Sequence, residues 1–196
     1  LAFNVKVLPE AELEASSLGV KIFQDNIIYH LLDQYLEWRQ KLKEEELEAK
    51  LNQLVRPGKF MIIPGYVFRR SDPAIVGVEV LGGVIRPGYP LITAKGREIG
   101  KILAIRDNDK SLDIARTGAK VAVSIEGKIM IGRHVDEGEV IYTDVPFDHA
   151  TKLLNEFRNY ISDDEVLTLK EIAELKRKLG LNEYALILNK LGVAQG

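Results

Sequence analysis

Two pairs of basic residues stand in surroundings that suit contact with a nucleic acid. The first pair follows two alternating aromatic residues in "PGYVFRR", and the second lies in "IGRHVDEG". Guanidinium groups bind phosphates and aromatic rings stack on unpaired bases, so the combination is typical of a surface for single-stranded nucleic acid. The candidate nucleic-acid-binding residues are Tyr66, Phe68, Arg69, Arg70, Arg133 and His134.

Structural roles are also open to these residues. The two arginines could form surface ion pairs with Asp72 and Glu79, and His134 could hydrogen-bond a turn. The two aromatic residues alternate with Val67 and could belong to a core.

The distribution of charge favours a polyanion near the first pair. The formal net charge of the chain is −2, but residues 56–106 contain 9 lysines and arginines against 3 aspartates and glutamates. The flanks are acidic: residues 1–55 contain 6 basic against 10 acidic residues, and residues 126–196 contain 9 against 13. A local positive excess can attract a polyanion even when the whole protein is acidic, although ordinary surface fluctuation gives a similar imbalance.

Sequence motifs for catalysis and metal binding are not found. The chain has no P-loop, no G-x-S-x-G, no H-E-x-x-H and no cysteine. The stretch "DNDKSLD" resembles a calcium loop, but Leu112 and Gly118 replace the required glycine and glutamate. We therefore expect no catalytic residue, metal site or cofactor in this segment. The lack of cysteine and of a signal or membrane segment fits a cytoplasmic protein.

The elements that position these residues predict an α+β fold in four regions. Residues 1–25 read as a partial βαβ unit at the end of an α/β domain, and residues 26–56 as a long connecting helix with a polar middle. The alternative for this helix is a surface helix packed on a neighbour. Residues 57–145 contain short strands rich in valine and isoleucine and predict a β-barrel, with one helical turn at "SLDIART". Residues 146–196 read as helices packed on or beside the barrel.

The last region carries two helix signals. "SDDE" at 162–165 has the residues of a capping box, in which a serine and a glutamate satisfy free backbone donors. The segment "NEYALILNKLG" is apolar in too many directions for one solvent-facing helix, so part of its surface must be covered. The cover could be the preceding helices, as a closed three-helix cap, or another protein.

Several phrases together resemble the universal translation initiation factor family, which comprises bacterial initiation factor two and the archaeal and eukaryotic factor five B. "GVKIFQDNIIYHLLDQY" is similar to the end of the third domain and the connecting helix. "PGYVFRRSDPAIVGVEVLGGVIRPGYPL" and "VAVSIEGKIMIGRHVDEGEVIY" resemble the fourth-domain β-barrel of the archaeal and eukaryotic branch. "GGVIRPGYPL" is also similar to a strand-turn-strand phrase in the second domain of elongation factor Tu.

The resemblance implies a function for each region. The barrel would bind the acceptor end of initiator Met-tRNA and support ribosomal subunit joining, while GTP and Mg would bind an upstream GTPase domain. The terminal helices would dock initiation factor one A, and the alternative is a protein-docking module that acts mainly through the last helix. The implied docking residues are Tyr184, Leu186, Ile187, Leu188, Leu191, Lys176, Arg177 and Lys178.

Overall fold

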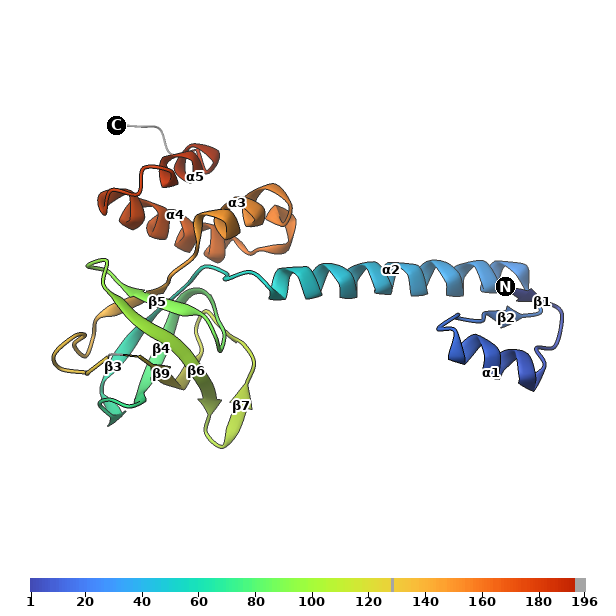
Figure 1. Ribbon diagram of the computed structural model, residues 1–196, viewed down its shortest axis with the longest axis horizontal. Coiled ribbons are helices and arrows are strands. Elements are labelled where there is room, and N and C mark those ends of the chain that lie inside the picture. The colour runs from blue at the N-terminus through green and yellow to red at the C-terminus, as the bar shows by residue number, and fades with distance from the viewer. Residues whose placement is uncertain (128, 193–196) are drawn as a thin grey trace. The chain divides into compact units, whose positions relative to one another are not determined.

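The computed structural model describes residues 1–127 and 129–192, and it divides into two compact units (Figure 1). The first unit is Leu1–Gln53 and the second is Leu54–Gly196. Together they contain a short parallel ladder, an antiparallel barrel-like sheet and C-terminal helices. This mixture of helix and sheet confirms the predicted fold class.

The first unit begins with a small βαβ arrangement. Strand β1 (Ala2–Phe3) pairs in parallel with β2 (Gln24–Asp25), and helix α1 (Pro9–Ser17) lies between them in the chain. Proline is suited to the first position of α1 because the amide there has no partner within the helix. Each strand has only two residues, so the ladder is shorter than the apolar sequence predicted.

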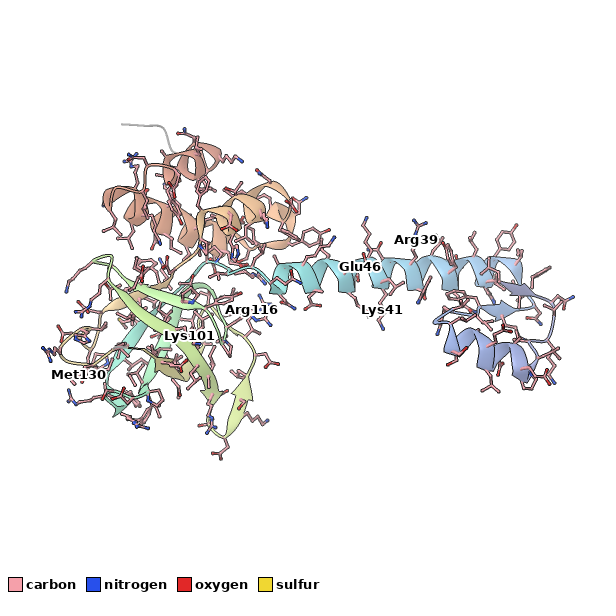
Figure 2. All side chains as sticks on the ribbon, viewed as in Figure 1. Arg39, Lys41, Glu46, Lys101, Arg116 and Met130 are labelled. Atoms are coloured by element: carbon pink, nitrogen blue, oxygen red, sulfur yellow. The ribbon has the colours of Figure 1, made fainter. Side chains whose placement is uncertain are left out.

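Helix α2 (Ile28–Asn52) completes the first unit. Its 25 residues give a rod of about 37 Å at 1.5 Å per residue. Phe23 packs edge-on against Tyr35 and Trp38 near its start, with ring centroids 5.9 and 5.3 Å apart. Further along, Arg39 and Glu46 project from the helix as charged side chains (Figure 2). The helix ends four residues before the predicted limit, and its role as a connector stays a prediction.

The second unit is built around a closed antiparallel barrel. The sheet order is β3-β10-β5-β6-β9-β4, and β3 also pairs with β4, so these six strands form a ring without free edges. Two short strands extend it: β7 pairs with β6, and β8 pairs with β4. The strands are β3 (Gly58–Arg69), β4 (Ala74–Ile85), β5 (Pro90–Thr93), β6 (Glu98–Asp107), β7 (Lys110–Leu112), β8 (Ala115–Arg116), β9 (Lys120–Glu126) and β10 (Val140–Thr143).

Alternating residues of these strands form the core. On β4, for example, Val76, Val78 and Val80 are buried inside the ring and the residues between them face outward. The helical turn predicted at "SLDIART" is wrong, because most of those residues belong to β7 (Lys110–Leu112) and β8 (Ala115–Arg116). Their backbone groups join existing strands, as in the pairing of Ser111 with Arg106, which satisfies more hydrogen bonds than a single helical turn would.

Three helices and one 3-10 turn follow the barrel and pack at one end of it (Figure 1). They are α3 (Phe147–Asn155), the 3-10 turn η1 (Arg158–Tyr160), α4 (Asp163–Lys178) and α5 (Tyr184–Lys190). The predicted capping box of α4 is confirmed: the Glu165 amide donates to the Ser162 hydroxyl and the Ser162 amide donates to the Glu165 carboxylate. Over the described residues, no helix combines the length and the apolar character that a membrane span requires.

Glu165 also fastens the helices to the first residues of the barrel. Its two carboxylate oxygens accept hydrogen bonds from Nε and Nη2 of Arg56, at 2.6 and 2.7 Å, and both side chains are buried. Beside this pair, the hydroxyl of Thr143 accepts from the Gly58 amide and donates to the Arg56 carbonyl. The helical layer and the barrel are therefore joined by a buried ion pair with two hydrogen bonds.

Candidate nucleic-acid interface

A bulge in β3 turns two aromatic rings outward. Ile62 pairs with Val78 of β4 and Val67 pairs with Val76, so the five residue steps of β3 oppose only two of β4. The extra residues leave the ladder, as in other β-bulges. Tyr66 and Phe68 consequently face solvent, with 55% and 65% of their surfaces exposed. The alternative that these rings belong to the core does not hold.

The two rings border a groove of about 520 Å³ on the outside of the barrel. On the other side of the groove lie Arg106, Asn108 and Lys120. The groove therefore joins aromatic faces, two cations, an amide and the Asp107 carboxylate in one concave surface. Its remaining lining residues are Ile63, Gly77, Val121 and Ala122.

Small residues form the floor of this groove. Gly77 of β4 pairs with Ala122 of β9, which in turn pairs with Arg106 of β6, so the three lie side by side across the sheet. A Cβ atom built on Gly77 would come within 2.8 Å of the Cβ of Tyr66, closer than real Cβ atoms approach. Glycine at this position is what lets the Tyr66 segment lie on the sheet.

The structure also brings the two predicted basic pairs together. The Ile131 amide donates to the Arg70 carbonyl at 3.0 Å, and Nη1 of Arg70 donates to the Ile131 carbonyl at 3.4 Å. Arg133 follows two residues later and is exposed. The first basic pair thus continues onto the loop that carries the second, forming one basic edge beside the end of β3.

The alternative roles of the basic residues have different outcomes. Within the described residues, no carboxylate lies within ion-pair distance of Arg69 or Arg70, and Glu79 lies 4.0 Å from Lys120 instead. His134 does hydrogen-bond a turn: its Nδ1 accepts from the Met130 amide at 3.2 Å. Met130 stands at the outer edge of the barrel (Figure 2). His134 therefore shapes this loop, while neither arginine is paired with a carboxylate of the described residues.

Sequence reasoning missed Arg106, Asn108 and Lys120. Arg106 and Lys120 lie at the ends of β6 and β9, and Asn108 lies in the turn that follows β6, where polar residues are common. Only the register between β6, β9 and β4 shows that they lie opposite Tyr66. The periodicity of β9 does indicate that Lys120 and Ala122 share a face, but it does not indicate which strand lies beside that face.

The terminal helix differs from the predicted docking surface. Tyr184, Ile187 and Leu188 are buried against α3 and α4, and the Tyr184 hydroxyl donates to the Val145 carbonyl at 2.8 Å. Lys176 is buried too and forms an ion pair with Asp144. These four side chains make contacts within the second unit, where they help to close a three-helix cap, so they do not face a partner protein.

The rest of the predicted docking set remains on the surface. Leu186 is 58% exposed, Leu191 is partly exposed, and Arg177 and Lys178 are exposed at the end of α4.

In the part of the chain that the structure describes, no group of three histidine, aspartate or glutamate side chains could hold a metal ion.

Comparisons with known proteins agree with this architecture. The family described as Elongation factor Tu domain 4 matches residues 56–142, which are nearly the whole barrel. The probable translation initiation factor IF-2 of Aeropyrum pernix is 61% identical over 98% of this chain and 31% of its own length. That of Ignicoccus hospitalis is 57% identical over 91% of this chain and 29% of its own.

A solved structure gives the same assignment. GDP-bound aIF5B from Aeropyrum pernix superposes with a TM-score of 0.75 at 62% identity, covering 97% of this chain and 32% of that protein. The chain thus spans about a third of the relatives that it matches. Along nearly its whole length, the chain matches the archaeal IF-2 and aIF5B translation initiation factors, which confirms the family resemblance found in the sequence.

Proposed function

We propose that this chain acts within a translation initiation GTPase and that its barrel binds the acceptor end of initiator Met-tRNA. In this proposal the barrel presents the tRNA while the ribosomal subunits join. GTP and its Mg ion bind elsewhere in the factor, outside the residues of this chain. The observation that carries the proposal is the groove between Tyr66 and Arg106, in a fold shared with translation factors.

The groove suits the chemistry of a single-stranded acceptor end. Unpaired bases stack on exposed rings such as Tyr66 and Phe68 without a requirement for one sequence. Phosphates between the bases are neutralised by guanidinium and ammonium groups, here Arg106 and Lys120. Arg69 and Arg70 extend the same positive surface beyond the rings.

The experiment is a binding titration of aminoacylated initiator tRNA with this chain at several salt concentrations. The variant Arg69→Ala/Arg70→Ala is expected to bind more weakly and to lower the salt slope by about two units, one for each lost phosphate contact. If affinity and salt slope are unchanged in a variant that is as stable as the original chain, these arginines are solvated surface residues that do not contact the tRNA.

A second candidate function is docking of a partner factor, for which initiation factor one A is the candidate from the resemblance. The exposed Leu186 and Leu191 supply an apolar contact, and Arg177 and Lys178 would attract an acidic segment. We expect Leu186→Ala to weaken this contact at any salt concentration, and the double variant Arg177→Ala/Lys178→Ala to weaken it mainly at low salt. Equal binding of initiation factor one A by the original chain and by both variants would rule out this function.

A further inference from the structure

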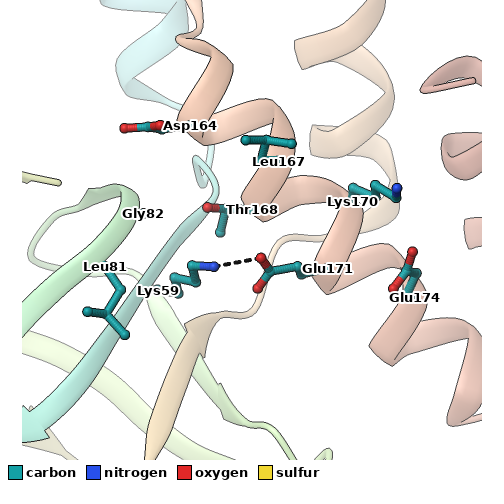
Figure 3. Close-up of a pocket in the computed structure, with 9 residues that line it drawn as sticks. All are labelled: Lys59, Leu81, Gly82, Asp164, Leu167, Thr168, Lys170, Glu171 and Glu174. Atoms are coloured by element: carbon teal, nitrogen blue, oxygen red, sulfur yellow. Dashed lines mark hydrogen bonds and ion pairs between the residues drawn. The ribbon is translucent and has the colours of Figure 1, made fainter.

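A second concave site lies between α4 and the barrel (Figure 3). Its volume is about 340 Å³, at the lower end of the range for small-molecule sites. One wall is the α4 stripe that contains Asp164, Leu167 and Glu174, and the other wall is Leu81 with Gly82 of β4. The nucleic-acid groove shares none of these residues.

The chain already places an alkylammonium group in this site. Nζ of Lys59 lies 2.6 Å from Oε1 of Glu171, and the Lys59 stem crosses Gly82. A Cβ atom built on Gly82 would come within 2.9 Å of the Lys59 Cε, so glycine provides the space for that stem. Oε2 of Glu171 accepts from the Tyr142 hydroxyl at 3.1 Å. The site thus holds an aliphatic chain that ends in a cation, bound by a carboxylate.

A buried hydroxyl in the same site lacks a hydrogen bond. Thr168 is 1% exposed and lines the site, and its Oγ1 has no partner among the described residues. Figure 3 shows this oxygen turned toward Gly82, beside the Lys59 stem. A buried hydroxyl without a partner is costly, and one more donor in the site would relieve that cost.

The two ends of the site carry further carboxylates. Asp164 and Glu174 are ten residues apart on α4, which corresponds to about 15 Å along the helix axis. The exposed Leu81 and Leu167 lie on the walls between them. Lys170 also lines the site, and Figure 3 shows its ammonium group turned away from Lys59, on the side of Glu174. Apart from Lys59 and Lys170, the charged and apolar lining residues run acidic, apolar and acidic along α4, which matches cations joined by methylene groups.

We propose that this site binds a linear aliphatic chain bearing ammonium groups, either a free polyamine or the lysine side chains of a peptide. Its ammonium groups bind Asp164 and Glu174, and its methylene groups lie against the two leucines. When the ligand displaces Lys59 from Glu171, the space that the Lys59 stem leaves beside Gly82 admits a donor of the ligand to Thr168. Because the ligand contacts both α4 and β4, it ties the helices to the barrel.

The test is a calorimetric titration of the chain with spermidine and, separately, with a short oligolysine peptide, together with Tm measurements. We expect spermidine to bind and to raise the Tm, since a ligand that binds only the folded state stabilises it. Asp164→Asn and Glu174→Gln should each weaken binding about fivefold or more. Lys59→Met should strengthen binding, because it frees Glu171 and keeps the apolar stem.

Two further variants separate this site from general attraction to an acidic surface. Thr168→Val removes the unpartnered hydroxyl, so we expect an equal or higher Tm without ligand and weaker binding. Glu156→Gln changes an exposed carboxylate outside the site and should have no effect.

The remaining outcomes either identify the natural source of the ligand or contradict the proposal. Binding of oligolysine without spermidine would assign the site to a peptide. Equal spermidine affinity in the Asp164→Asn, Glu174→Gln and Glu156→Gln variants would overturn the proposal. If Lys59→Met does not fold, the two rim variants still decide the test, because their side chains are not buried.

Discussion

The Cβ atom of Tyr66 occupies the space that a side chain at Gly77 would need. The approach would be 2.8 Å, and the atom involved is the first of the Tyr66 side chain, which cannot swing aside as a flexible end can. The position of the aromatic edge of the groove therefore depends on the absence of a Cβ atom at Gly77 on the neighbouring strand.

Gly77→Ala should displace Tyr66 and weaken tRNA binding. The backbone of Gly77 lies in a region that alanine also adopts, so the clash with Tyr66 is the main cost, and we expect a loss of stability of about 1–3 kcal/mol from overpacking. The affinity should fall by a similar amount, which is the scale of one base-stacking contact. Ser124→Ala, on the outward face of β9, is the control and should bind normally in the same titration.

The aromatic and basic edges of the groove should affect binding in different ways. Tyr66→Ala/Phe68→Ala should lower the affinity for tRNA and leave its salt slope unchanged, because stacking releases no counterions. Arg106→Ala/Lys120→Ala should lower both, and the slope should fall by about two units. Lys101→Ala/Arg116→Ala removes two exposed cations that do not line the groove, as a control. A matching loss in that control would point to general attraction.

The elements and the site differ in how far the sequence predicts them. Strand periodicity and turn residues were sufficient to predict the barrel, and "SDDE" was sufficient to predict the capping box of α4, since these signals are local.

The pairing of Gly77 with Ala122, and of Ala122 with Arg106, depends on strand order. For the same reason Arg106 and Lys120 were not found, whereas Tyr66, Phe68, Arg69 and Arg70 were adjacent in the chain. On α5, burial of Tyr184 depended on which helices cover it.

The Arg56–Glu165 pair should be important for stability. Arg56→Met leaves a buried carboxylate without its cation, so we expect a loss of about 3–5 kcal/mol in the free energy of unfolding. Arg56→Met/Glu165→Leu should be more stable than that single variant, because neither charge remains buried. Urea unfolding measures both values. Lys101→Ala removes one partner of an exposed ion pair with Glu126 and should cost only about 0–1 kcal/mol.

Two tyrosines should make the protein sensitive to alkaline pH. Burial, with a smaller contribution from Glu171, raises the pKa of Tyr142 to about 12, and burial also raises the pKa of Tyr184 to about 12. In the unfolded chain tyrosine loses its proton near pH 10, so between about pH 10 and 12 the unfolded state binds fewer protons than the folded state, and stability falls as the pH rises. Tm measurements against pH should show this decline, and Tyr142→Phe should make it shallower. A parallel decline in that variant would contradict the assignment.

A proline in the exposed part of α2 tests its proposed role as a connector. Ala49→Pro should break the helix at a cost of about 3 kcal/mol, visible as lost helicity in circular dichroism. In the complete factor we expect it to impair ribosomal subunit joining. Ala49→Gln, which keeps the helix, should have little effect. Normal subunit joining by the proline variant would show that a continuous helix is not required.

We expect the terminal bases of the tRNA to stack on Tyr66 and Phe68. The most direct test uses initiator tRNA with the fluorescent base 2-aminopurine in place of its terminal adenine. Binding to the chain is expected to change the fluorescence, because the base moves onto an aromatic ring. The change should vanish in Tyr66→Ala/Phe68→Ala at protein concentrations that still saturate the tRNA, and it should persist in Lys101→Ala/Arg116→Ala. The same fluorescence change in all three proteins would show that the acceptor end does not bind in this groove.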